Sequence, residues 1–135
     1  VSGADVVIGS RYVKGGKTND SKVSIIMSHI LNFVFRIITG IKAKDISTDF
    51  RMYDTKQLKA VKLTCQNYDI LQEVLLKMKI NNRKLVVKET PIVFEKRLYG
   101  ESKRQLFKFI LVYVKTLFML IGVRINASFN KNRQK

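Results

Sequence analysis

The sequence has little of several residue types on which common classes of site depend. Its 135 residues include one cysteine, Cys65, and one histidine, His29. A single cysteine excludes an internal disulfide and a cysteine-based zinc site, and it suits a reducing compartment. A lone histidine leaves no histidine cluster for a metal ion. Other side chains must therefore carry the chemistry of this chain.

Acidic residues are also scarce. The chain has 10 aspartate and glutamate residues against 26 lysine and arginine residues, a formal net charge of +16. A surface this basic attracts polyanions, namely nucleic acid, anionic lipid headgroups or phosphorylated substrates. The hydrophobic fraction of 46% is enough for a folded core, and the length allows at most one domain. Because Val1–Asp5 runs straight into a strand with no initiator methionine, we expect a fragment of a longer domain.

The first strand ends next to a basic residue. The apolar run Asp5–Ser10 predicts a buried strand of a mostly parallel sheet. Arg11 and Tyr12 follow its carboxyl end, where open α/β sheets place their ligands.

The next segment predicts a helix from Ser21, as its cap, to Thr39, with Gly40 as its stop. Its polar residues recur every four positions and share one face, at Ser24, Ser28, Asn32 and Arg36. Two interpretations are open for this stripe. It is a solvated face, or it lines a cleft, which small hydroxyl and amide groups suit better.

Shorter elements are predicted in the middle of the chain. A polar turn and an extended piece cover residues 45–53, and a short helix covers 55–61. A further helix, 70–80, has Asp69 as its cap and Gln72 as a capping-box partner. Residues 85–94 predict a strand in which Pro91 indicates an edge position or a bulge.

A strand–loop–helix junction at Pro91–Lys103 is the strongest phosphate signal. Arg97, Gly100, Ser102 and Lys103 lie where a strand end leads into a helix, a natural place to hold phosphate oxygens. A solvated basic loop is the alternative. The helix that follows is predicted to reach about Ile121.

That last helix is apolar with a basic stripe. Arg104, Lys108 and Lys115 fall within about 40° of each other, and the apolar runs are shorter than the roughly 20 residues that span a bilayer. This pattern suits a helix in a membrane interface, and a core helix with a solvated lysine face is the alternative. We divide the chain into a domain at 1–103, an amphipathic helix at 104–122 and a basic tail at 123–135.

Six motifs occur in an order that resembles one family. They are Asp5–Tyr12, Ser28-x-x-x-Asn32, Asp45-x-x-Thr48-x-Phe50-Arg51, Gln72-Glu73, Glu89-x-Pro91-Ile92-x-Phe94 and Arg97-x-x-Gly100-x-Ser102-Lys103. Over about residues 3–110 the chain resembles the C-terminal half of a family 2 glycosyltransferase of the dolichol-phosphate mannosyltransferase type. The resemblance implies a partial GT-A fold, a Rossmann-like α/β/α sandwich without its N-terminal nucleotide-binding half.

The resemblance also implies an activity. Such enzymes transfer a sugar from a nucleotide-sugar to a polyprenyl phosphate (dolichyl or undecaprenyl) with the help of Mg²⁺ or Mn²⁺. The expected location is the cytoplasmic face of the cell membrane, peripheral or monotopic. The missing half is a further expected partner, and we expect this chain alone to be inactive.

Site residues follow from the same resemblance. Arg97, Ser102 and Lys103 would hold the donor diphosphate, and Arg11 and Ser28 would receive the acceptor phosphate. Asp45, Arg51 and Glu73 would line or brace the cleft, although Asp45 and Glu73 could also simply cap or pair locally. No catalytic residue is assigned. The chain contains no Asp-x-Asp, so no metal ligand is expected within it.

Two further functions stay open. The chain could be a non-catalytic membrane-interface partner or remnant. A nucleic-acid-binding module is the weaker alternative, because the sequence has no recognisable RNA- or DNA-binding motif, and we expect no nucleic acid as partner.

Overall fold

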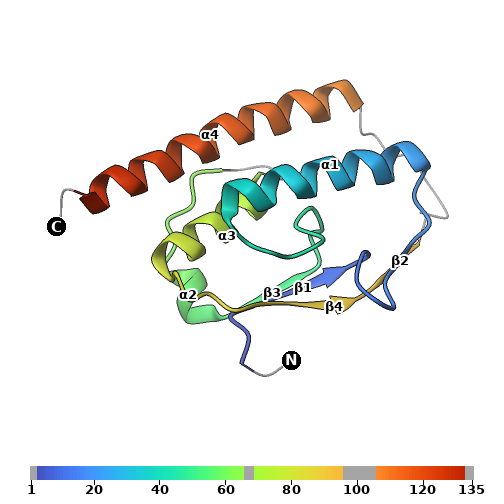
Figure 1. Cartoon of the computed structure of the whole chain (residues 1–135), viewed down its shortest axis with the longest axis horizontal. Helices are drawn as coiled ribbons and strands as arrows, with labels where there is room; N and C mark the ends of the chain where they lie inside the picture. Colours follow the sequence, from blue (N-terminus) through green and yellow to red (C-terminus); the bar gives the residue numbers. More distant parts are fainter. Residues whose placement is uncertain (1–2, 66–68, 96–105, 133–135) are drawn as a thin grey trace.

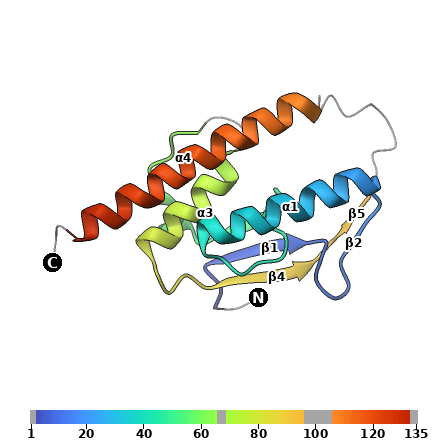
Figure 2. The same ribbon diagram turned by 45° about the horizontal axis from the view of Figure 1, so that its top comes forward.

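The computed structural model describes residues 3–65, 69–95 and 106–132 of the chain. It is a mixed α/β fold, as predicted, and it is consistent with part of a Rossmann-like fold. Helices α1, α3 and α4 lie on one side of a small sheet made of β1, β3 and β4 (Figures 1 and 2). The elements are β1 Val6–Ser10, β2 Lys17–Thr18, α1 Lys22–Thr39, β3 Arg51–Tyr53, α2 Thr55–Lys59, α3 Ile70–Asn81, β4 Val87–Pro91, β5 Val93–Phe94 and α4 Leu106–Asn132.

The sheet has the strand order β3-β1-β4 and is mixed. β1 runs parallel to β4, with Val6 opposite Val87 and Ser10 opposite Pro91. β1 and β3 are antiparallel, so the predicted mostly parallel sheet is correct only for the β1–β4 pair. Parallel strands end at the same edge, so the residues that follow β1 and β4 lie close together.

The predicted strand 85–94 is interrupted. β4 and β5 are separated at Ile92, and β5 pairs with β2 in a second, two-stranded sheet. Ile92 still accepts a hydrogen bond from Lys17 and donates one to the Ser10 carbonyl. Pro91 lies in the strand at one side of the described sheet, as its missing N–H predicted.

α1 has the predicted caps. The Ser21 side chain accepts from the Ser24 N–H at 3.2 Å, and Gly40 ends the helix in the left-handed conformation with φ 68°. Asp69 is the N-cap residue of α3, as predicted, but its side chain makes no cap hydrogen bond. The predicted capping box is wrong, because Gln72 is fully buried and its side-chain carbonyl accepts from Arg51.

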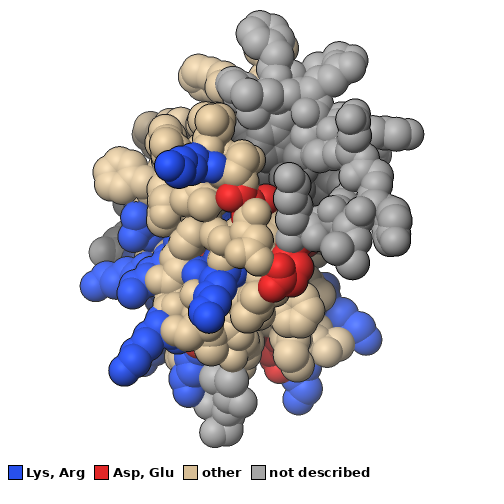
Figure 3. All heavy atoms as spheres, turned by 90° about the vertical axis from the view of Figure 1, so that its right-hand side faces the viewer, with Lys and Arg blue, Asp and Glu red and all other residues tan. Residues whose placement is uncertain are grey.

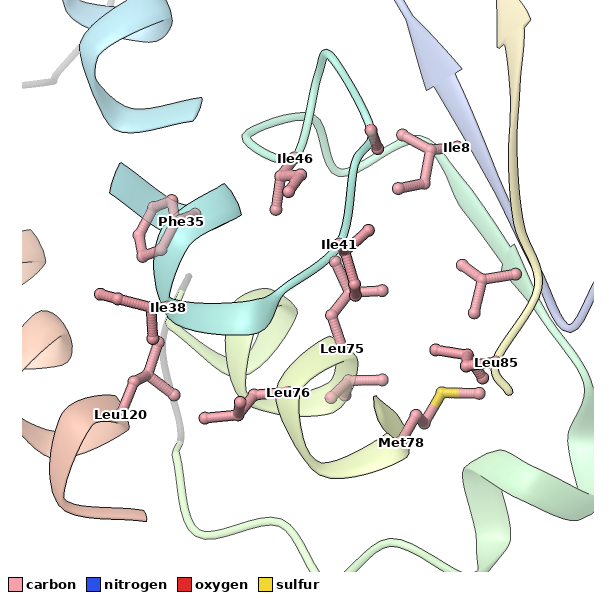
Figure 4. Packing of buried hydrophobic residues seen from close by; sticks show 13 residues of the cluster. Ile8, Phe35, Ile38, Ile41, Ile46, Leu75, Leu76, Met78, Leu85 and Leu120 are labelled. Atoms are coloured by element: carbon pink, nitrogen blue, oxygen red, sulfur yellow. The ribbon is translucent and has the colours of Figure 1, made fainter. Parts of the chain in front are cut away.

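The core lies between the helices and the sheet (Figure 4). Ile8 of β1 faces the chain around Ile46, and Leu75 of α3 lies below Ile41. At the other side of the core, Leu120 of α4 lies next to α1 and α3 and is fully buried. The last helix is therefore packed onto the domain by its own core residue.

α4 is longer than predicted, because it continues to Asn132 rather than ending near Ile121. Gly122 does not stop it, and the Arg124 guanidinium donates to the carbonyls of Ile37 and Ile38 at the end of α1. Residues that the sequence assigned to a basic tail are thus helical as far as Asn132. Of the predicted basic stripe, Lys115 is exposed, Arg104 lies outside the described residues, and the Lys108 side chain is not described.

α1 presents its apolar side to solvent. The exposed side chains recur three or four residues apart, at Val23, Ile26, Ile30, Phe33 and Ile37, each more than half exposed. Ser28 and Asn32 are buried on the other side. The solvated-face interpretation of the polar stripe is therefore wrong for these two residues. α1 is long and apolar enough to cross a membrane, although 28% of its candidate span is buried here and core helices pass the same test.

Candidate functional site

Arg11 lies immediately after β1, at the carboxyl end of the parallel β1–β4 pair. The loop that follows is held close to it by Gly16. A Cβ on Gly16 would lie 2.5 Å from the Ser10 carbonyl oxygen and 2.7 Å from that of Arg11, closer than real Cβ contacts allow. The tight loop therefore fixes the backbone from which the Arg11 side chain extends.

The Arg11 guanidinium forms a two-point pair with Asp45. Arg11 Nε lies 2.7 Å from Asp45 Oδ2, and Arg11 Nη2 lies 2.8 Å from Asp45 Oδ1. The Arg11 backbone N–H also donates to Oδ2, at 3.0 Å. The Asp45 side chain is fully buried and that of Arg11 is 10% exposed. Such a fork fixes the plane of the guanidinium.

Three small polar residues complete the network. Arg11 Nη2 donates to Ser28 Oγ at 2.9 Å and to Ser47 Oγ at 3.0 Å. Asn32 donates to Asp45 Oδ1 at 3.3 Å and accepts from the Ser47 N–H at 2.7 Å. This network, formed by Arg11, Ser28, Asn32, Asp45 and Ser47, is called the Arg11 cluster below.

The pair keeps both partners charged. Burial by itself raises the pKa of Asp45, but the hydrogen bonds and charge of Arg11 outweigh it and hold that pKa below its ordinary value. Burial lowers the pKa of Arg11, and the hydrogen bond and charge of Asp45 outweigh it and raise that pKa. Asp45 is therefore an ionised anchor for Arg11, with its oxygens already occupied by donors.

A second carboxylate fixes the loop that carries Asp45. Glu89 of β4 accepts from the N–H groups of Lys44 at 2.9 Å and Asp45 at 3.1 Å. The cluster is thus attached to both strands of the parallel pair, through Arg11 after β1 and through Glu89 in β4.

One edge of the Arg11 guanidinium is less occupied. Nη1 lies 3.6 Å from Asp20, whose side chain is 29% exposed, and the described contacts include no hydrogen bond from Nη1. The rings of Tyr12 and Phe94 lie 5.0 and 5.7 Å from the guanidinium carbon. An anion that displaced Asp20 would meet the N–H groups of Nη1 close to two aromatic side chains.

Arg51 braces the loop beneath the cluster. It donates to the carbonyls of Thr48 at 2.8 Å, Leu71 at 2.6 Å and Ile46, and to Gln72 Oε1 at 3.2 Å. These acceptors belong to the 45–48 loop and to the start of α3. Arg51 therefore joins α3 to the loop that holds Asp45, and its described contacts do not include Arg11.

Glu73 has a separate role. It accepts from the N–H groups of Thr64 and Cys65 and from Lys77 Nζ at 2.7 Å, so it ties residues 64 and 65 to α3. Burial raises the pKa of Glu73, but these donors outweigh it and lower the pKa to about 2. Burial, together with Glu73, raises the pKa of Cys65 to about 12, so this thiol stays protonated.

The face around the cluster carries both signs of charge. Figure 3 views the end of the molecule where β1 stops, with basic side chains over its lower part and acidic patches near its centre. The proposed diphosphate residues Arg97, Ser102 and Lys103 lie outside the described residues. Across the described ranges, no three histidine, cysteine or acidic side chains gather to hold a metal ion. Asp45 does not fit that task either, because its oxygens already accept from Arg11, Asn32 and Ser47.

The structure thus unites some predicted residues and separates others. Arg11, Ser28 and Asp45 meet in one network, whereas Arg51 and Glu73 contact other parts of the chain. Asn32, Ser47, Glu89 and Asp20 were not predicted as site residues. Asn32 could have been found, because it lies one helical turn after Ser28 on the polar stripe.

Comparison with known proteins identifies relatives, although no protein-family model matches. The chain is 33% identical over 128 residues to a dolichol-phosphate mannosyltransferase from Pyrococcus furiosus, an alignment that covers 89% of this chain and 34% of the relative. It is 32% identical over 104 residues to a polyprenol monophosphomannose synthase from Mycolicibacterium smegmatis, covering 76% and 39%. It is 33% identical over 104 residues to an undecaprenyl-phosphate mannosyltransferase from Micrococcus luteus, covering 74% and 42%.

The chain thus spans well under half the length of each of these relatives. The similarity nevertheless extends over at least 74% of this chain in each comparison. The chain is homologous to the dolichol-phosphate mannosyltransferase-like glycosyltransferases, the family that its sequence motifs predicted.

Proposed function

We propose that this chain forms the acceptor-phosphate side of an enzyme that transfers a sugar from a nucleotide-sugar to a polyprenyl phosphate. The names of the three relatives support this proposal, because each one includes a polyprenol-type acceptor or product. The observation that carries the proposal is the Arg11 cluster, because it holds a guanidinium at the carboxyl end of two parallel strands with its Nη1 edge toward the partly exposed Asp20.

Transfer to a polyprenyl phosphate requires mainly that the acceptor phosphate is held in the correct position. A phosphate monoester has a second pKa near 6, so a polyprenyl phosphate is largely a dianion at neutral pH and needs little help from a base. It does need a cation that places it beside the donor diphosphate, another anion. Arg11 supplies that charge, and Asp45 fixes the direction of its guanidinium.

Ser28 acts indirectly in this proposal. It is buried, and its hydroxyl accepts from Arg11 Nη2 and lies 2.9 Å from the Ser47 hydroxyl. Its role is then to hold Arg11 rather than to touch the lipid phosphate. The Nη1 edge is the direct ligand, and Asp20 occupies it when no anion is bound.

A membrane surface is the second part of the proposal. The exposed apolar stripe of α1 supplies a face that a bilayer interface would cover. α4 adds further exposed apolar side chains, which include Leu111, Phe118 and Phe129. Because α1 keeps Ser28 and Asn32 buried against the domain, we propose that it lies along the interface rather than across the bilayer. The cytoplasmic face is part of the same proposal.

The donor site is proposed only from the resemblance to the glycosyltransferase family. Arg97, Ser102 and Lys103 would hold the diphosphate, and Mg²⁺ or Mn²⁺ would be bound by residues that this chain does not supply. Mannose is the sugar that the relatives' names suggest. A non-catalytic role at the membrane is the competing proposal, and transfer assays of a protein that also contains the donor side would distinguish the two.

Binding of a short-chain polyprenyl phosphate tests the acceptor site directly. We expect Arg11→Gln to weaken this binding at least ten-fold relative to the unchanged protein, because it removes the charge that faces the phosphate. The matched control is Lys14→Gln in the same loop, whose side chain is exposed and is not part of the cluster. Equal affinities of the two variants, with both folded by circular dichroism, would refute the assignment of Arg11.

A further inference from the structure

A cavity lies at the C-terminal end of α1, whereas the Arg11 cluster contacts the middle of this helix. It is open to solvent, has a volume of about 470 Å³ and is lined by the C-terminal ends of α1 and α3 and by the second half of α4. Thr39 at its wall is seven residues beyond Asn32, the nearest cluster residue on α1, about 10 Å along the helix axis at 1.5 Å per residue. The cavity is therefore a separate site.

Three basic side chains line this cavity: Lys79 and Arg83 from α3 and the residues after it, and Arg124 from α4. Among the described lining residues none is acidic. Leu76 and Ile80 form apolar parts of the wall. The lining thus combines cations with an apolar surface, the mixture that a ligand with an anionic head and an apolar body requires.

Two of these cations are held in place by backbone carbonyls. Lys79 Nζ donates to the Arg83 carbonyl at 2.7 Å, and Arg124 Nη1 donates to the Ile38 carbonyl at 2.7 Å. Each bond uses only part of the donor capacity of the group, which has three N–H bonds in lysine and five in arginine. The remaining donors are available to a ligand without a change in these anchoring contacts.

The net charge at the cavity favours an anion. The carboxyl-terminal ends of α1 and α3 each contribute roughly half a negative charge. Together these offset about one of the three positive charges, which leaves roughly two. A phosphate group carries between one and two negative charges at neutral pH, so it matches that remainder.

We propose that this cavity binds a phosphate group, with Lys79, Arg83 and Arg124 as its ligands. The phosphate belongs either to a lipid headgroup or to a soluble phosphate compound. The exposed side chains of Ile37 and Ile125, which are close in sequence to the wall residues Thr39 and Arg124, would lie in the same interface as a lipid. The inference does not depend on the acceptor site at Arg11.

Arg83→Gln tests the site with little risk to the fold, because Arg83 is exposed and the described contacts of its side chain include no hydrogen bond or ion pair. The matched control is Lys84→Gln, a neighbouring exposed cation that is not among the described lining residues. One arm titrates inorganic phosphate and follows the backbone amide signals of Gly40 and Ile80 by NMR. The other measures binding to phosphatidylcholine vesicles with and without 20% phosphatidylglycerol.

We expect Arg83→Gln to weaken binding at least five-fold in one arm, with Lys84→Gln within two-fold of the unchanged protein. A loss confined to the vesicle arm identifies a lipid headgroup, and a loss with inorganic phosphate identifies a soluble ligand. Equal binding by the two variants in both arms would overturn the proposal. Lys79→Gln, measured in the same way, must weaken the same arm as Arg83→Gln, and an effect in neither arm would also overturn it.

Discussion

Arg11 and Asp45 are 34 residues apart in sequence and form a two-point pair, with Nε–Oδ2 at 2.7 Å and Nη2–Oδ1 at 2.8 Å. The pair joins the end of β1 to the loop after α1. Because Asp45 is fully buried, its carboxylate depends on Arg11 for compensation of its charge. The same contact therefore stabilises the fold and orients the proposed phosphate ligand.

Asp45→Asn is expected to destabilise the protein by about 3 kcal/mol. The substitution keeps the shape of the side chain but leaves the positive charge of Arg11 nearly buried without its partner, a change that costs about 3–5 kcal/mol in buried pairs. Urea denaturation measures the free energy of unfolding. The control is Asp20→Asn, which removes the longer, partly exposed ion pair of Arg11 and should cost no more than about 1 kcal/mol. Similar losses for both variants would contradict the buried-anchor role of Asp45.

Acid should weaken the protein partly through Glu73. Its pKa is lowered from 4.5 to about 2 in the folded state, so the unfolded chain binds the proton more readily. The stabilisation is therefore complete above the unfolded pKa, and it is lost as the pH falls from about 4.5 to 2. The shift corresponds to roughly 3 kcal/mol.

Glu73→Gln should flatten this pH dependence. Urea midpoints measured from pH 7 to pH 2.5 are expected to fall less steeply in the variant than in the unchanged protein. Asp49→Asn is the control, because Asp49 is exposed and its side chain has no described hydrogen bond or ion pair. If the two variants had the same acid profile, the assignment of the stabilisation to Glu73 would be wrong.

Gly16→Ala and Gly122→Ala form a matched pair with opposite expected effects. The added Cβ at Gly16 would press on two backbone carbonyl oxygens that cannot turn away, which should cost about 1–3 kcal/mol and displace Arg11. At Gly122, within α4, nothing lies within 4 Å of the added Cβ. There alanine should stabilise the helix by about 0.5–1 kcal/mol. Thermal unfolding of the two variants distinguishes the effects, and a stabilised Gly16→Ala variant would contradict the tight loop.

Local sequence signals predicted much of the fold. The apolar run of β1, the Ser21 cap and the Gly40 stop of α1 all lie where they were expected, because each depends on neighbouring residues alone. Interactions across the chain decided the rest. Ile92 bonds to Lys17 and Ser10 and thereby divides the predicted strand, and Arg124 bonds to the end of α1 while α4 continues past its predicted end.

The orientation of α1 was likewise not predictable from local sequence signals. Its sequence contains a polar stripe and a wide apolar surface, and by helix periodicity alone the apolar side is the one expected to be buried. Two residues of the polar stripe are buried instead, because Ser28 and Asn32 complete the hydrogen bonds of Arg11 and Asp45. Motifs predicted that Arg11, Ser28 and Asp45 share a site, but they did not separate Arg51 and Glu73 from it, since those contacts depend on where α3 packs.

The exposed apolar face of α1 is predicted to contact the membrane. Ile30→Gln with Phe33→Gln removes two apolar side chains that are 52% and 58% exposed, so the free energy of unfolding should change by less than about 1 kcal/mol. Binding to anionic vesicles should fall at least ten-fold if these residues enter the interface, because burying one large apolar side chain contributes about 1.5–3 kcal/mol. The control is Met52→Gln, a 72% exposed side chain on β3 rather than on α1. Vesicle co-sedimentation in which both variants bind as well as the unchanged protein would exclude α1 as the membrane face and leave the apolar stripe for another partner.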